Sequence, residues 1–223
     1  MNDIDNIDSK EMRKQKVRDA KTKLILDAAL EVLSQKGYYE TRLEDIAEKA
    51  GFSKSALYRY YQDKEEIFFT IAVQEKNKVI RKLSSDQYRI SKEYHISENL
   101  RRLLAVSFTA WGDNFSFLLA INSFQVIAIV SALQNQGKLM EIKKDFLSSE
   151  SEMAGMMIDM FDNAKKKNEI TTRLDSKVLF EFYQGILFSK VKKWHLQKKM
   201  DDITTTIEEI ITFLSNGLGI VPK

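Results

Sequence analysis

Residues 25–72 read ILDAALEVLSQKGYYETRLEDIAEKAGFSKSALYRYYQDKEEIFFTIA, and the signals that start and stop helices in this stretch decide the fold. Apolar residues recur at helical spacing ahead of Gly37, which predicts a helix over 17–36 that ends at the glycine. Thr41 and Glu44 have the spacing of a capping box, in which each side chain bonds a free amide at a helix start. A second, short helix is therefore expected directly after Thr41.

A third helix is expected after Gly51, which ends the second one. Ser53 can accept a hydrogen bond from an amide of the first turn and so start the third helix. Asp63 and Glu66 repeat the capping signal and start a fourth helix. Two short helices joined by a tight turn over 41–61 are the pattern of a helix-turn-helix, whose second helix enters the major groove of DNA.

The apolar pattern stays helical to the end of the chain. It predicts helices over 63–83, 97–112, 115–134, 138–167, 175–198 and 202–216. Ser97 and Asp175 are expected as N-caps, and Gly217 as the C-cap of the last helix. The chain has 8 Gly and 1 Pro in 223 residues, whereas a β-sandwich or barrel needs a turn about every 8–12 residues. The expected fold class is all-α.

Several kinds of chemical site lack the residues that would build them. The absence of cysteine excludes disulfides, iron–sulfur clusters, thiolate zinc sites and a cysteine nucleophile. His95 and His195, the two histidines, are expected at the surface near helix ends and leave little for a metal site or a histidine triad. The sequence also lacks a nucleophile elbow, a P-loop, a glycine-rich dinucleotide turn and an HExxH motif. We therefore expect no enzyme, no cofactor and no metal.

One uncharged stretch raises the question of a membrane. No charge occurs from Asn114 to Gly137, which is long enough to span a bilayer. Asn122 and Gln125 lie near its middle, where hydrocarbon would leave their amides unsatisfied. The stretch is therefore interpreted as a buried helix or helix pair, without a membrane partner. Because the N-terminus MNDIDNIDSK lacks the apolar segment of a secretory signal, the expected location is the cytoplasm.

The stretch 25–72 resembles the N-terminal domain of TetR-family transcriptional regulators. The resemblance rests on Ala28-Ala29, Gly37-Tyr38, Thr41, Ile46-Ala47, Ala50-Gly51, Ser53, Leu57-Tyr58, Lys64-Glu65 and the spacings between them. It implies a three-helix helix-turn-helix DNA-binding domain over 17–62. The residues before this domain, 1–16, are interpreted from their composition as a mobile basic and polar arm. It also implies a larger helical domain over 63–223 that binds a small-molecule effector and forms a homodimer.

The resemblance implies roles for individual residues. The candidate DNA-binding residues are Thr41, Arg42, Ser53, Lys54, Ser55, Ala56, Tyr58, Arg59, Tyr60 and Lys64. Thr41 and Lys64 would contact phosphates, and for Lys64 a cation at a helix N-terminus agrees with that role. Ser55 stands where the family often has Gly, so base preference cannot be transferred. Arg59 would either read guanine through O6 and N7 or contact a phosphate.

The segment from Lys10 to Lys23 has seven basic and two acidic residues. It is either a solvated extension of the first helix or a cationic arm that adds salt-sensitive affinity for DNA. The formal net charge of the whole chain, +3, is too weak to decide between them.

The last two helices carry more apolar surface than one core uses. Apolar residues cover about 220° of helix 175–198 and about 160° of helix 202–216, wider than the stripe of a surface helix. Gly185 and Ser189, four residues apart, permit close approach of another helix. The surplus is either buried within the monomer or forms a dimer interface, as the family's dimerisation bundle implies. The candidate interface residues are Phe182, Tyr183, Ile186, Ile207, Ile211 and Leu214.

Aromatic and Met side chains over 104–161 suit either plain core packing or an adaptable apolar cavity. The resemblance implies an effector pocket there. The candidate lining residues are Phe108, Trp111, Phe115, Asn122, Gln125, Met153, Met157 and Phe161. Because the uncharged stretch contains no acid, nothing favours a cationic ligand over a neutral or acyl one, and an apolar or amphipathic effector is expected.

The function we expect is a repressor that an effector releases from a palindromic operator. The alternatives are an effector-independent architectural or cell-cycle DNA-binding protein on the same fold, and a helical protein-interaction module whose DNA motif is silent. Release of DNA by a ligand would exclude the first alternative, and DNA binding by the intact protein would exclude the second.

Overall fold

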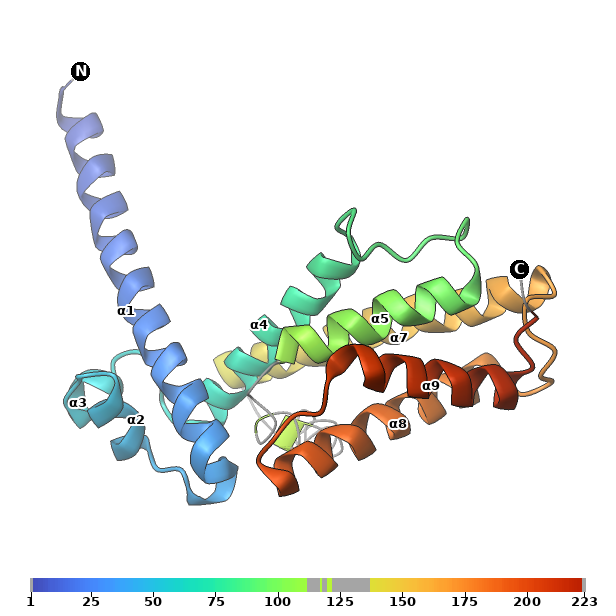
Figure 1. Cartoon of the computed structure of the whole chain (residues 1–223). Coiled ribbons are helices and arrows are strands. Elements are labelled where there is room, and N and C mark those ends of the chain that lie inside the picture. The colour runs from blue at the N-terminus through green and yellow to red at the C-terminus, as the bar shows by residue number, and fades with distance from the viewer. Residues whose placement is uncertain (1, 112–116, 118–119, 122–136, 222–223) are drawn as a thin grey trace. The chain divides into compact units, whose positions relative to one another are not determined.

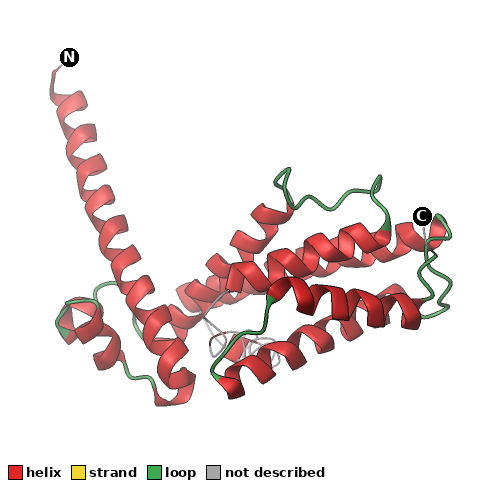
Figure 2. Ribbon diagram, viewed as in Figure 1, coloured by secondary structure: helices red, strands yellow, loops and turns green. Residues whose placement is uncertain are grey.

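The computed structural model describes residues 2–111, 117, 120–121 and 137–221. Its helices are α1 Asn2–Glu40, α2 Leu43–Lys49, α3 Lys54–Leu57, α4 Lys64–Leu83, α5 Ile96–Trp111, α7 Lys138–Lys166, α8 Ser176–Gln197 and α9 Ile203–Leu218 (Figure 1). Figure 2 shows helices and connecting loops, without a strand, among the residues described. The expected all-α class is confirmed.

The chain divides into two compact units, Met1–Ile71 and Ala72–Lys223. The boundary falls inside α4, whereas the sequence suggested a division before that helix. The first turns of α4 belong to the N-terminal unit because Phe68 is fully buried there and its ring lies 5.1 Å from that of Tyr38, edge to face.

Helix α1 begins at Asn2, so the described part of the segment 1–16, which the sequence assigned to an arm, is helical. Acidic residues near the helix start favour this, because they lie at the positive end of the helix dipole. Pairs one turn apart add support, such as Lys14 with Glu11, whose charged atoms are 2.7 Å apart. At its other end, Gly37 has φ 77° and interrupts the helix where the sequence predicts.

The helix starts in the N-terminal unit fit the predicted caps with one exception. The Ser53 hydroxyl accepts from the Ala56 amide at 3.2 Å, and the Asp63 carboxylate accepts from the Glu66 amide at 2.7 Å. The box expected between Thr41 and Glu44 is wrong by one residue. In its place, the amide of Arg42 donates to the Asp45 carboxylate at 2.9 Å.

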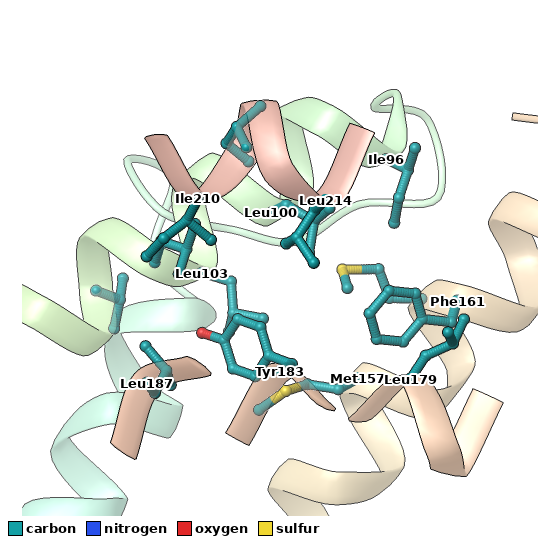
Figure 3. Close-up of a cluster of buried hydrophobic side chains, with 14 of the residues drawn as sticks. Ile96, Leu100, Leu103, Met157, Phe161, Leu179, Tyr183, Leu187, Ile210 and Leu214 are labelled. Carbon is teal, nitrogen blue, oxygen red and sulfur yellow. The ribbon is translucent and has the colours of Figure 1, made fainter. Parts of the chain in front are cut away.

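The C-terminal unit is a bundle in which α5 packs on α9 and α7 on α8. Its core contains Leu103, Met157, Phe161, Tyr183 and Leu214, whose side chains converge from these four helices (Figure 3). The Tyr183 hydroxyl lies 3.2 Å from that of Ser107, which satisfies both groups inside the core. The four helices therefore pack around the buried side chain of Tyr183, whose hydroxyl has a hydrogen-bonding partner.

Helix ends in the C-terminal unit bring three corrections. Helix α5 begins at Ile96, before the expected cap Ser97, and the Ile96 amide donates to the Glu169 carboxylate at 2.8 Å. His95 is half-buried, because its ring nitrogens contact the Ser97 hydroxyl at 2.8 Å and the Val221 carbonyl at 3.0 Å. Helix α9 runs through Gly217 to Leu218 and ends at its C-cap, Gly219, with φ 61°. Asp175, as expected, caps α8 by accepting from the Lys177 amide at 2.8 Å.

None of the helices in the described part of the chain combines the length and apolar character that crossing a membrane requires. The helix expected over 115–134 lies mostly outside the described residues, and so does the uncharged stretch 114–137.

Candidate DNA-binding site and effector unit

The turn between α2 and α3 has the geometry of a helix-turn-helix. Gly51 takes φ 73°, a left-handed conformation that favours glycine, and reverses the chain after α2. The Phe52 amide donates to the Ala47 carbonyl at 2.8 Å and closes the turn. Ala47 and Leu57 are buried on either side of the turn, so apolar contacts fix the angle between the two helices.

Helix α3 presents an exposed, hydrogen-bonding face. Ser53 and Ser55 are exposed and their hydroxyls lie 3.1 Å apart. Lys54 forms an ion pair with Glu44 of α2, which raises the pKa of Lys54, and its ammonium lies 5.9 Å from the centre of the Tyr58 ring. The face therefore offers two hydroxyls, a phenol and a cation, the groups that contact phosphates and base edges.

The remaining candidates differ in how far they reach the surface. Arg42 and Arg59 are exposed, at the start of α2 and just after α3. Ala56 and Tyr60 are half-buried. The Tyr60 ring packs edge to face against Phe52, with ring centres 6.0 Å apart. Of this group, the two arginines have the reach and the exposure for groove or phosphate contact.

Thr41 and Lys64 are placed differently from the implied phosphate contacts. Thr41 is 2% exposed and its hydroxyl donates to the Gly37 carbonyl at 2.7 Å. The Lys64 ammonium donates to the carbonyls of Tyr38 and Thr41 at 2.5 and 2.8 Å. Both side chains therefore tie the end of α1 to α2 and α4 instead of facing a ligand.

The candidate pocket residues fall into two groups. Phe108, Met153, Met157 and Phe161 are buried in the core of the C-terminal unit. The side chain of Trp111, and Phe115, Asn122 and Gln125 entirely, lie outside what the structure describes. The structure therefore brings the first four into one apolar core, in which Met157 and Phe161 face Tyr183 (Figure 3).

The candidate interface residues differ in how far they are buried. Tyr183, Ile207, Ile211 and Leu214 are at most 9% exposed and contribute to the core of their own unit. Phe182 is 55% exposed. The wide apolar arcs of α8 and α9 could not show which side faces inward, because that depends on where α5 and α7 lie.

A groove of about 580 Å³ runs along the outer faces of α8 and α9. Phe182, Gly185, Ile186, Ser189 and Phe213 line it, together with residues that close its floor. Phe213 is 67% exposed and was missed among the interface candidates, although its apolar character within helix 202–216 was a usable signal. These two helices therefore keep an apolar surface that their own unit leaves uncovered.

A buried polar cluster between α4 and α7 was not predicted from the sequence. Lys76 is 4% exposed, forms an ion pair with Glu150, and lies 5.0 Å from the centre of the Phe146 ring. The Ser149 hydroxyl donates to the Asn77 side chain at 3.1 Å. Burial lowers the pKa of Lys76 to about 7. A lysine in an amphipathic helix normally indicates a solvent face, so only packing reveals this site.

Among the described residues, no group of three or more His, Cys, Asp or Glu side chains is placed to hold a metal.

The known proteins that this chain resembles include bacterial regulators. Residues 25–71 match the family description "Bacterial regulatory proteins, tetR family". The fatty acid metabolism regulator protein of Bacillus subtilis is 22% identical over 194 residues, covering 87% of this chain and 93% of that protein. The regulator RutR of Escherichia coli is 44% identical over 59 residues, which is 26% of this chain and 28% of RutR.

Two solved structures share the fold over most of the chain. FadR from Bacillus subtilis in complex with stearoyl-CoA has a TM-score of 0.61 at 21% identity, covering 87% of this chain and 97% of that one. AibR in complex with isovaleryl coenzyme A and operator DNA has a TM-score of 0.67 at 17% identity. The match covers 86% of this chain and 97% of the AibR chain. At these identities the likeness concerns the fold.

The helix-turn-helix and the helical bundle that follows it define the class of protein, a DNA-binding transcription regulator. Within that class, the segment 25–71 is that of the TetR family of bacterial regulatory proteins.

Proposed function

We propose that the chain is a homodimeric repressor that an acyl-coenzyme A thioester, or a similar amphipathic ligand, releases from a palindromic operator. The N-terminal unit is the DNA-binding domain, and the chain from Ala72 onward is the effector and dimerisation domain. The observation that carries the proposal is the exposed polar face of α3, held by a glycine turn within the segment that matches the family.

DNA recognition is assigned to the exposed residues around α3. Ser53 and Ser55 have short, exposed side chains whose hydroxyls, 3.1 Å apart, allow close approach to base edges. Arg59 has the guanidinium that bonds guanine O6 and N7 together. Arg42 and Tyr58 are exposed beside them and contact the flanking phosphates.

A dimer follows from the geometry of operators and from the outer face of α8 and α9. Two half-sites one DNA turn apart require a protein with two-fold symmetry. Phe182 and Phe213 expose more than half of their side chains beside the groove that these helices form. A second copy of the chain covers that surface, since large aromatic rings are enriched at the centres of interfaces.

An acyl effector is favoured by the comparisons and by the composition of the bundle. The solved structures named above contain stearoyl-CoA and isovaleryl coenzyme A. The core around Met153, Met157 and Met160 is rich in flexible thioether side chains, which adapt to an inserted chain. To switch operator occupancy, the effector must bind the DNA-free form more tightly by several kcal/mol.

The first experiment selects bound sequences from a random duplex pool with the purified chain, and repeats the selection with Arg59→Ala. We expect a palindromic consensus for the unmodified chain and at least tenfold weaker binding of that consensus by Arg59→Ala. Retention without any consensus would favour the architectural alternative, and no retention would contradict DNA binding.

In the second experiment, acyl-CoA of short, medium or long chain length is added to the complex that the protein forms with the selected duplex. Coenzyme A and free fatty acid are the controls. We expect release by at least one thioester and not by coenzyme A alone. Continued DNA binding at saturating thioester would overturn the effector assignment and leave the DNA-binding assignment standing.

A further inference from the structure

The N-terminal part of α1 extends beyond the body of its own unit. From Lys10 onward, Ile25 is the first fully buried residue, and every side chain from Lys10 to Leu24 is exposed except the half-buried Thr22. These 15 residues form about 22 Å of helix, at 1.5 Å per residue. Figure 1 shows this dark blue segment continuing past α2 and α3 of the same unit.

Most of the cations on this segment lack a carboxylate partner among the described residues. Lys14 pairs with Glu11 at 2.7 Å and Lys23 with Asp27 at 2.5 Å. The unpaired cations of the segment are Lys10, Arg13, Lys16, Arg18 and Lys21. The described residues therefore leave most of this charge uncompensated.

Four of the cations form one stripe along the helix. At about 100° per residue, Lys10, Lys14, Arg18 and Lys21 fall within an arc of about 80°. The same arc, followed toward the C-terminus, contains the buried residues Ile25, Ala28 and Val32. The same face of α1 is therefore buried against its own unit from Ile25 onward and is exposed and cationic from Lys10 to Lys21.

This stripe is costly unless an anionic partner lies against it. Like charges four residues apart, such as those of Lys10 and Lys14, destabilise an isolated helix. Successive cations are about 4.5–6 Å apart along the axis, and the stripe is about 17 Å long. Duplex DNA has one phosphate per ~3.4 Å of axis on each strand, so several phosphates fall along that length.

We propose that the stripe Lys10, Lys14, Arg18 and Lys21 contacts the phosphate backbone of duplex DNA that flanks the half-site read by α3. This inference rests on the proposed DNA-binding function. The occupant is DNA because the stripe matches the charge of phosphates, and because α1 packs against α2, which belongs to the helix-turn-helix. The segment adds affinity without sequence preference, since phosphates are the same at every base pair.

The test compares two double variants that each remove two lysine charges from α1. Lys10→Gln with Lys21→Gln lies on the stripe, and Lys16→Gln with Lys23→Gln lies on the opposite side of the helix. Binding to the selected operator is measured from 50 to 200 mM salt, with flanking duplex and without it. Glutamine keeps helix propensity, and circular dichroism checks that α1 is retained.

We expect the stripe variant to lower the slope of log affinity against log salt by about 1.8 on the flanked duplex, and the opposite-side variant to change it far less. On the duplex without flanks the two variants should bind alike. Equal slopes for both variants on flanked DNA would overturn the inference, while the unmodified chain's operator binding would keep the proposed function intact. Failure of the unmodified chain to bind any duplex would overturn both. Binding of the stripe to anionic lipid vesicles with no effect on DNA would also overturn the inference.

Discussion

The ammonium of Lys64 contacts Tyr38 twice. Its nitrogen lies 2.5 Å from the carbonyl oxygen of Tyr38 and 4.3 Å from the centre of the ring. A second hydrogen bond to the Thr41 carbonyl, at 2.8 Å, connects the start of α4 to the segment before α2. Burial of this nitrogen lowers the pKa of Lys64. A cation that the family resemblance assigns to a phosphate thus holds the DNA-binding unit together.

Replacing Lys64 by Met should destabilise the N-terminal unit by about 1–3 kcal/mol, because two carbonyls lose a charged donor. Lys49→Met is the control, since its exposed pair with Glu31 contributes at most about 1 kcal/mol. Hydrogen exchange of amides in α2 and α4 measures the effect. A loss of operator affinity with unchanged protection would instead indicate a phosphate contact.

Two glycines at the end of α9 should respond oppositely to alanine. Gly219 has φ +61°, and a Cβ there would lie 2.1 Å from the Thr171 hydroxyl oxygen. Gly219→Ala should therefore cost more than about 1 kcal/mol. Gly217 lies within the helix with nothing near its missing Cβ, so Gly217→Ala should stabilise by about 0.5–1 kcal/mol. Urea unfolding followed by circular dichroism measures both, and equal changes would contradict the assignment of Gly219 as the cap.

The stability of the C-terminal unit should depend on Lys76 above neutral pH. Burial lowers the pKa of Lys76 to about 7, while the unfolded chain keeps a value near 10.4. Between these values the unfolded state binds more protons, so the free energy of unfolding rises with pH.

Urea unfolding between pH 7 and 9 should show this rise in the unmodified chain and not in Lys76→Met. Lys78→Met is the control, because Lys78 lies two residues away on the same helix and is half exposed, in a pair with Glu75. If the free energy of unfolding changed with pH in the same way for the unmodified chain and for Lys76→Met, the buried ammonium would not be the cause of the rise.

The exposed aromatic residues of α8 and α9 should control dimerisation. Phe213 is 67% exposed and lines the groove, so Phe213→Glu places an unpaired charge in the proposed interface. We expect at least tenfold weaker self-association by sedimentation equilibrium, with little change in unfolding. Leu196→Glu, also on an exposed apolar residue of α8 but outside the groove, should leave association unchanged. Equal effects of the two changes would place the interface elsewhere.

Local signals in the sequence determined the helix starts and stops of the N-terminal unit. Gly37 and Gly51 were readable because left-handed backbone favours glycine, and Ser53 and Asp63 because a short polar side chain reaches the amides of the next turn. The exposed residues around α3 were also identifiable, since they belong to a motif of fixed spacing.

Only the tertiary structure decided which side of each helix faces inward and which cations are enclosed. Lys64 and Lys76 resemble solvent-facing lysines in the sequence, and packing of distant segments encloses both. Tyr183 and Phe182 are neighbours of similar character, yet one is 1% and the other 55% exposed. Periodicity fixes the angle between two side chains on a helix, whereas the direction of the core depends on where the other helices lie.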